Sequence, residues 1–85
     1  MRKADRIEAA LRAAFAPREL TVVDDSASHA GHAGAPHGGE SHFNVHMRAD
    51  AFAGQSRIAR HRAVHAAIGS ELMADIHALA IDVDV

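Results

Sequence analysis

The spacing of apolar residues predicts a helix near the start of the chain, over about residues 4–15. The apolar residues at i, i+4, i+7 and i+8 share one side of such a helix: Ile7, Leu11, Ala14 and Phe15. Ala16 is followed by Pro17, and the residue before a proline resists the α conformation, so the helix should end there. A short β-type run with two adjacent valines follows over residues 20–24.

Apolar and polar residues alternate strictly over residues 42–48, which predicts a half-buried strand. Phe43, Val45 and Met47 form its apolar face. The other face carries only polar side chains: His42, Asn44, His46 and Arg48.

A second helical stretch is predicted over residues 57–73, with Ser56 as its N-cap and Gly69 as the point where it frays or divides. A final alternating run over residues 76–85 predicts a strand. In that run His77 shares a side with four aliphatic residues: Leu79, Ile81, Val83 and Val85. We therefore expect His77 at the beginning of this strand, partly shielded from water.

The segment 25–41 is rich in glycine and other small residues and repeats His-Ala-Gly, which predicts a loop. The two strands that it joins should be antiparallel, because they are sequential. The last strand follows a helical crossover, so it should run parallel to its neighbour. Three strands with helices on one face form a two-layer α+β domain.

Eight histidines and no cysteine are the main chemical feature of the composition. A disulfide, a thiolate metal site and a cysteine nucleophile are excluded, so any metal must be bound by imidazole, carboxylate or a partner's ligands. The 85 residues allow one small domain, residues 1–85. No apolar run approaches a membrane span, and the charged start is unlike a secretory signal. We therefore expect a soluble, cytoplasmic protein without membrane contact.

Several short motifs occur in a specific order over residues 5–82. They are Asp24-Asp25-Ser26, Gly39-Glu40-Ser41-His42-Phe43, Arg60-His61-Arg62 and His77-Ala78-Leu79-Ala80. This combination resembles the BolA family. The resemblance implies an α-β-β-α-α-β domain akin to the class II KH fold, with a three-stranded mixed sheet. That order agrees with the elements expected from periodicity.

The resemblance also implies a function. In this family a 2Fe–2S cluster is bridged to a monothiol glutaredoxin, in iron–sulfur cluster assembly, trafficking or iron signalling. The glutaredoxin cysteine and glutathione supply thiolates, and the BolA partner supplies a histidine near the last strand plus a histidine or cysteine from the loop between the first two strands. The chain would then be a non-catalytic adaptor, and the cluster would be absent from the isolated protein. Whether the free protein forms a homodimer stays open.

The implied ligands fall on histidines of this chain. Spacing alone favours a half-buried structural role for His77, but its place in the His-Ala-Leu-Ala motif makes it the implied fixed ligand. His29 best matches the loop ligand, with His32 as its substitute and His37 as a third candidate. Imidazoles in place of thiolates on one iron are the Rieske arrangement. Because the chain has no cysteine, a partner must bring the sulfur.

A second metal interpretation is direct binding of Zn²⁺, Ni²⁺ or Cu²⁺ by four histidines: His29, His32, His37 and His42. Their spacing matches no rigid helical pattern, and the intervening glycines make a preorganised site costly. We interpret His42 mainly as a structural residue of its motif, and His46 as a surface residue.

The start of the second helical stretch is basic, with Arg57, Arg60 and Arg62 and no acidic residue between Asp50 and Glu71. These arginines are candidates for contact with glutaredoxin or glutathione. Contact with DNA would instead make the chain a nucleic-acid-binding transcriptional regulator. Two observations argue against DNA binding. The net charge is −2, and the second glycine of a G-x-x-G loop is missing. The arginines could equally fix the helix against the acidic stretch 71–84.

An enzyme is not expected. The serines with a histidine nearby in the sequence have no fixed scaffold that would link nucleophile, base and orienting group.

Overall fold

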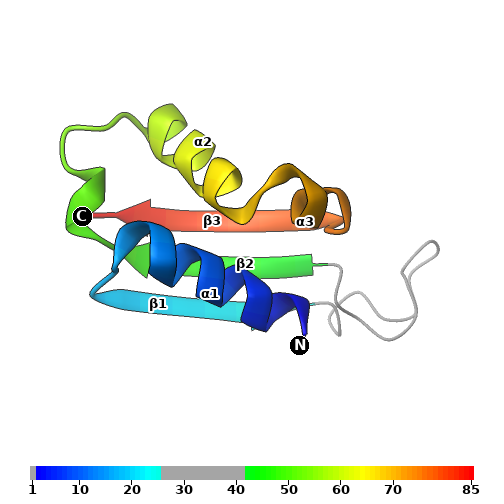
Figure 1. Cartoon of the computed structure of the whole chain (residues 1–85). Helices are drawn as coiled ribbons and strands as arrows, with labels where there is room; N and C mark the ends of the chain where they lie inside the picture. The colour runs from blue at the N-terminus through cyan, green and yellow to red at the C-terminus, as the bar shows by residue number, and fades with distance from the viewer. Residues whose placement is uncertain (1, 26–41) are drawn as a thin grey trace.

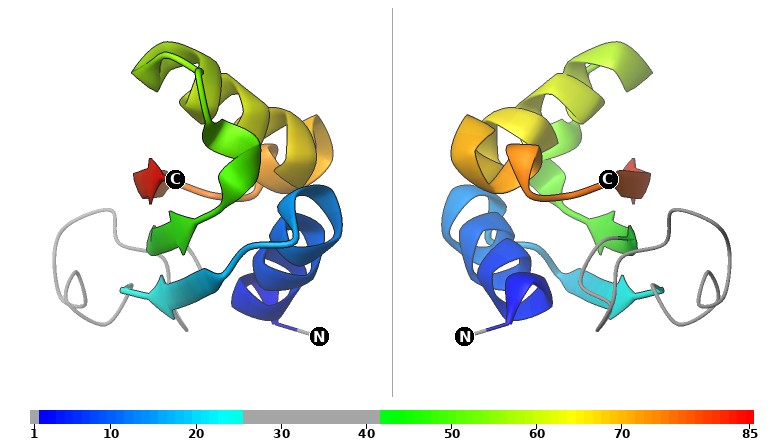
Figure 2. Two further views of the ribbon diagram at one scale, coloured as in Figure 1. Left: turned by 90° about the vertical axis from the view of Figure 1, so that its left-hand side faces the viewer. Right: turned by 90° about the vertical axis from the view of Figure 1, so that its right-hand side faces the viewer.

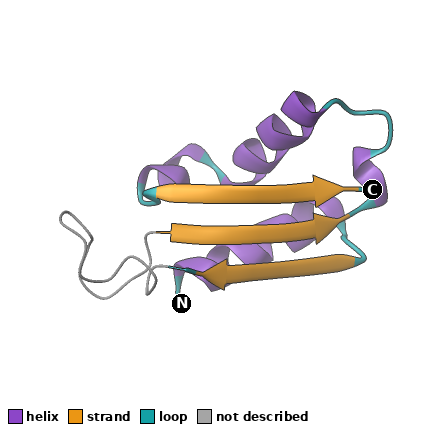
Figure 3. Cartoon of the chain, turned by 180° about the vertical axis from the view of Figure 1, so that it is seen from behind, coloured by secondary structure: helices purple, strands orange, loops and turns teal. Residues whose placement is uncertain are grey.

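The computed structural model describes residues 2–25 and 42–85. Its elements in chain order are α1 (Lys3–Phe15), β1 (Glu19–Asp24), β2 (His42–Arg48), the 3-10 turn η2 (Asp50–Phe52), α2 (Arg57–Ile68), α3 (Ser70–Ala74) and β3 (Ala78–Asp84). The helices lie on one face of the sheet (Figures 1 and 2). Seen from behind, the three strands lie in front of the helices (Figure 3). The expected two-layer α+β fold is confirmed.

The sheet has the order β1-β2-β3. β1 pairs with β2 in the antiparallel sense, and β2 pairs with β3 in the parallel sense, as the connections predicted. In the parallel pair His42 lies opposite Ala78, and Arg48 lies opposite Asp84. The first residues of β2 and β3 therefore meet at one end of the sheet (Figure 1).

The core lies between the sheet and the helices. Every second residue of β2 is buried, as the alternation predicted: Phe43, Val45 and Met47. Facing them are buried residues of the helices: Ile7 and Leu11 of α1, Val64 and Ile68 of α2, and Leu72 of α3. Phe52 of η2 is also buried and packs on Phe15, with ring centroids 4.8 Å apart. Removal of these side chains from water is the main force that holds the helices on the sheet.

The predicted start of the second helical stretch and its predicted division at Gly69 are confirmed. The Ser56 hydroxyl accepts a hydrogen bond from the Ala59 N–H at 3.1 Å, which caps α2. Gly69 then adopts φ 92°, a conformation that side chains with a Cβ rarely adopt, and divides α2 from α3.

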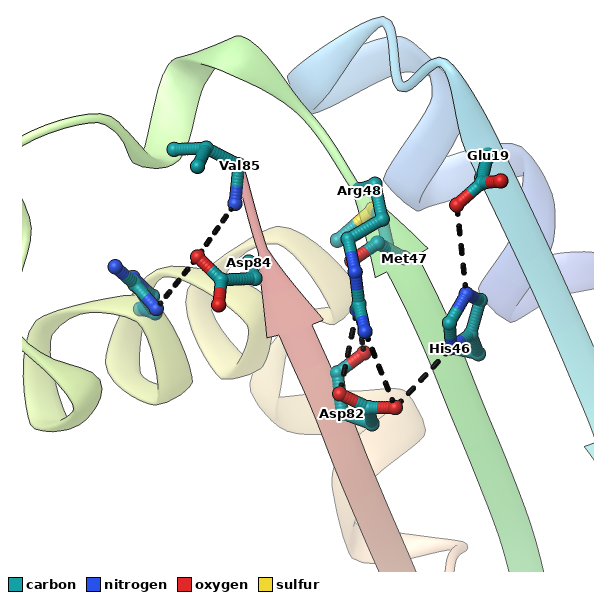
Figure 4. Close-up of polar contacts among 8 residues, drawn as sticks. Glu19, His46, Met47, Arg48, Asp82, Asp84 and Val85 are labelled. Carbon is teal, nitrogen blue, oxygen red and sulfur yellow. Dashed lines mark hydrogen bonds and ion pairs between the residues drawn. The ribbon is translucent and has the colours of Figure 1, made fainter.

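The open face of the sheet carries a charged network that spans all three strands (Figure 4). His46 Nδ1 lies 3.1 Å from an Asp82 carboxylate oxygen, and His46 Nε2 lies 3.6 Å from a Glu19 carboxylate oxygen. Arg48 Nη1 lies 3.2 Å from the other Asp82 oxygen. The hydrogen bond with His46, followed by that with Arg48, holds the pKa of Asp82 below its ordinary value. The network links β1, β2 and β3 in the register that brings their ends together.

Asp82→Asn tests this network, because it removes the shared negative charge. The folded-state pKa of Asp82 lies below the unfolded value of about 3.9, so the ionised carboxylate stabilises the fold above that pH. The stabilisation is lost as the pH falls through the lowered folded-state pKa. We expect the variant to melt below the wild type at pH 7, with a difference that shrinks as the pH falls below about 4.

Thermal unfolding followed by circular dichroism measures both proteins at each pH. Asp75→Asn is the control, because the Asp75 side chain forms no ion pair within residues 2–25 and 42–85. The same difference in melting temperature at every pH would contradict a role for the Asp82 charge.

Ser56→Ala tests the cap of α2. Loss of the hydrogen bond to the Ala59 N–H should lower the free energy of unfolding by about 1 kcal/mol. Ser70→Ala is the matched control, because Ser70 starts α3, where no side chain caps the helix. Urea unfolding of both variants gives the comparison, and equal effects would show that the Ser56 cap contributes nothing specific.

Candidate metal-ligand site

Two histidines meet at the end of the sheet where β2 and β3 begin. The ring centroids of His42 and His77 lie 4.9 Å apart, and the ring planes are tilted by 47°. His42 is the first residue of β2, and His77 immediately precedes β3. Because the strands are parallel and His42 is paired with Ala78, the sheet register itself brings the rings together.

His42 is held firmly by its backbone. Its carbonyl oxygen accepts a hydrogen bond from the Asp25 N–H at 2.7 Å, which extends the β1–β2 ladder. On its other side it is paired with Ala78 of β3. The His42 residue is half-buried, so its ring is partly shielded from solvent.

The expected position of His77 needs a correction. The alternating pattern predicted that it lies in the last strand and is partly shielded, whereas the structure places it before β3 and exposed. The reason lies in the last turn of α3: the N–H groups of Asp75 and Ile76 donate to the carbonyl oxygens of Leu72 and Met73. Those bonds keep the chain in a turn up to Ile76, so the strand begins two residues later than the alternation predicted.

The other predicted metal ligands cannot be placed. His29, His32 and His37 lie outside the described residues, and their assignment as loop ligands stays a prediction. Within residues 2–25 and 42–85, no group of three or more histidine, aspartate or glutamate side chains is arranged to hold a metal ion. The described part of the chain therefore offers a pair of imidazoles, and a metal bound to them would need further ligands from elsewhere.

The three predicted contact arginines have different environments. Arg57 and Arg62 are exposed on α2. Only 22% of the Arg60 side chain is exposed, and its Nη1 lies 3.2 Å from an Asp84 carboxylate oxygen. Arg60 thus fixes α2 to the end of β3, in agreement with the alternative interpretation that these arginines bind the acidic stretch.

The imidazole pair and the Arg60–Asp84 contact lie at opposite ends of β3. The seven residues of this strand span about 20 Å. The two contacts are therefore separated by the length of the strand.

Sequence reasoning missed the contacts of His42 and His46. His42 was interpreted as structural, and its contact with His77 was not expected. The parallel pairing of two strands that both begin near a histidine was a usable signal for that contact. His46 was expected on the surface, and its side chain is 44% exposed there; its contacts with the carboxylates of Glu19 and Asp82 were not predicted.

No helix in the described ranges has the length and apolar character that crossing a membrane requires.

Comparison with known proteins gives a consistent result. Residues 11–84 match the family model of the BolA-like proteins. The DNA-binding transcriptional regulator BolA of Escherichia coli (strain K12) is 44% identical over 77 residues, covering 91% of this chain and 70% of that protein. SufE-like protein 1 of Arabidopsis thaliana, chloroplastic/mitochondrial, is 42% identical over 80 residues, covering 89% of this chain and 22% of that protein.

A solved structure is similar as well. The BolA domain of SufE1 from Arabidopsis thaliana matches with a TM-score of 0.81 and 39% sequence identity, covering 96% of this chain and 90% of that one. The family match over residues 11–84 and these similarities lead to one conclusion: the chain belongs to the BolA-like protein family.

Proposed function

We propose that this chain is a non-catalytic adaptor that binds a monothiol glutaredoxin and co-ligates a bridging 2Fe–2S cluster with it and with glutathione. The observation that carries the proposal is the exposed imidazole of His77, at the end of the sheet and against a second imidazole, in a chain without cysteine. The E. coli relative is named a transcriptional regulator, not an enzyme, which supports the non-catalytic part.

The donor atoms fit one half of such a cluster. Histidine nitrogen replaces cysteine sulfur on one iron in Rieske centres, so imidazole is a competent ligand for a 2Fe–2S cluster. The sulfur ligands of the other iron must come from outside, because this chain has none to give. His77 is accessible from solvent, and a cluster carried by a partner can therefore reach it. The cluster is the cargo of the complex in this proposal, and the chain contributes binding and orientation.

His77→Ala tests the proposal. Addition of the wild-type protein to a cluster-loaded monothiol glutaredoxin should change the visible absorption and circular dichroism spectra, because a ligand of the iron changes from sulfur or solvent to nitrogen. The variant should lose that change.

His65→Ala is the matched control, since His65 is also an exposed histidine but lies on α2. It should reproduce the wild-type spectra. Spectra that His77→Ala leaves identical to those of the wild type would overturn the assignment of His77 as a ligand.

A second candidate function is nucleic-acid binding through α2. Arg57 and Arg62 are exposed, and the first turn of α2 holds no acidic residue. The positive end of the helix dipole adds to these charges. The E. coli relative is named a DNA-binding transcriptional regulator, which supports this candidate.

Replacement of both Arg57 and Arg62 by alanine tests DNA binding. If each arginine neutralises a phosphate, the dependence of log affinity on log salt should become shallower by about 1 for each arginine replaced. Fluorescence anisotropy with duplex DNA over a series of salt concentrations measures this slope. Arg6→Ala on α1 is the control, and an unchanged slope in the double variant would exclude this surface.

A further inference from the structure

We propose that the outer edge of β1 pairs with β1 of a second copy of this chain, so that two sheets join into one continuous sheet in a homodimer. The proposal is independent of the metal centre and of the proposed function. It rests on the backbone of β1, on the residues along that strand and on the different cover of the two edges of the sheet.

The hydrogen bonds between β1 and β2 leave alternate residues of β1 facing away from the sheet. The Asp25 N–H donates to the His42 carbonyl oxygen at 2.7 Å, so these two residues form a hydrogen-bonded pair of the antiparallel ladder. Such pairs alternate along the ladder, so the backbone groups of Leu20 and Val22 point to the outer edge. Within residues 2–25 and 42–85, these outward N–H and C=O groups have no hydrogen-bond partner. They are a template for a further strand.

The other edge of the sheet, formed by β3, is less accessible. α2 lies alongside β3 at that edge (Figures 1 and 2), and Arg60 of α2 contacts the Asp84 carboxylate at the end of the strand. A helix beside an edge strand protects it from pairing with another chain. In the described part of the chain the edge of β1 has no such cover, because α1 contacts β1 from the helical face of the sheet (Figure 2). The edge of β1 is therefore the one open to a second strand.

One register makes two copies of β1 complementary. In a two-fold antiparallel pair centred on Thr21, Leu20 lies opposite Val22 of the second copy. Each such pair can exchange N–H···O=C bonds in both directions, because both residues point outward. The side chains of Leu20 and Val22 are half-buried in a single chain, and in the pair they contact each other across the junction.

Charges at the ends of the strand support this register. Arg18 lies opposite Asp24 of the second copy, and the two-fold axis repeats this pair of opposite charges at the other end. Arg18 already contacts the Asp50 carboxylate of its own chain, and its guanidinium has further N–H donors for a second carboxylate. Glu19 lies opposite Val23, which is 46% exposed in a single chain and gains a neighbour in the pair.

The neighbouring two-fold registers lack this match. With the axis one residue later, Glu19 would lie opposite Asp25 of the second copy, so like charges would face each other. With the axis one residue earlier, Asp24 would lie opposite Ala16, beyond the end of the strand. The axis at Thr21 is therefore the register that we expect.

The pairing leaves the other surfaces of the chain accessible. β3 lies at each outer edge of the joined sheet, so the imidazole pair and the exposed arginines of α2 stay open to other partners. The two-fold axis is perpendicular to the sheet, which puts both helical layers on one face and the two copies of α1 side by side. α1 exposes small side chains, among them Ala9 and Ala13, which permit a close approach of two helices.

Sedimentation equilibrium of the whole chain tests for the dimer. The apparent mass of the wild type should rise with protein concentration, from the 9.0 kDa of one chain toward twice that value. Thr21→Lys and Thr21→Glu should each abolish the rise, because like charges would meet at the axis. Thr21 is exposed in a single chain, so neither substitution disturbs the core. An equimolar mixture of the two variants should restore the dimer, because opposite charges then meet.

A single introduced cysteine locates the interface, because this chain has no other. Thr21 faces its own copy in a non-hydrogen-bonded pair, where Cα atoms are about 4.5 Å apart, within the range that a disulfide bridges. Thr21→Cys should therefore give a cross-linked dimer on mild oxidation. Ala80→Cys, at an exposed position of β3, is the matched control and should cross-link far more slowly.

Three results would overturn the proposal. The first is a wild-type mass of one chain at every concentration. The second is a dimer that Thr21→Lys leaves unchanged, which would place the contact on another surface. The third is cross-linking of Thr21→Cys that is no faster than that of Ala80→Cys.

Discussion

The parallel pairing of β2 with β3 is the interaction on which the rest of the structure depends. It is the only parallel contact in the three-stranded sheet of the described residues, and it joins segments separated by α2 and α3. Its register decides which side chains share an end of the sheet. At one end it brings His42 beside His77, and at the other it brings Arg48 and Asp84 into one row. A different register would leave the same elements without either arrangement.

Burial and charge have separate parts in fixing that register. Burial of a side chain such as Phe43 or Met47 is worth about 1.5–3 kcal/mol, whereas an exposed ion pair is worth about 1 kcal/mol or less, so burial dominates the stability. A slip of two residues, however, returns every side chain to its own face and leaves the apolar pattern satisfied. Such a slip would move Asp82 from its place opposite His46 to a place opposite Asn44 or Arg48, so Asp82 would no longer lie between His46 and Arg48 as it does here. The weaker interactions therefore select among registers that burial alone does not distinguish.

The same distinction explains what could be predicted from the sequence. The helices and strands follow from local periodicity, and the senses of the two strand pairs follow from the connections between them; these predictions are confirmed. The predicted start of β3 was wrong by two residues. The N–H groups of Asp75 and Ile76 donate to carbonyl groups of α3, and an alternating pattern of apolar residues cannot reveal such hydrogen bonds. His77 was identified as a candidate ligand through its motif, although its exposure to solvent was not predicted. The contact with His42 depends on the pairing register, which is a long-range property that no single segment of the sequence carries.

The geometry also bears on how one small domain could have two partners. The imidazole pair lies at the start of β3, and the Arg60–Asp84 contact, which fixes the first turns of α2, lies at its other end, about 20 Å away. With Arg60 engaged by Asp84, the arginines left for a second partner are Arg57 and Arg62, both on the exposed surface of α2. A metal centre at one end and an anionic partner at the other would share the β3 strand but no ligand atoms. The two proposed activities are therefore separable in this fold, because the charges that serve one surface are not required to complete the other.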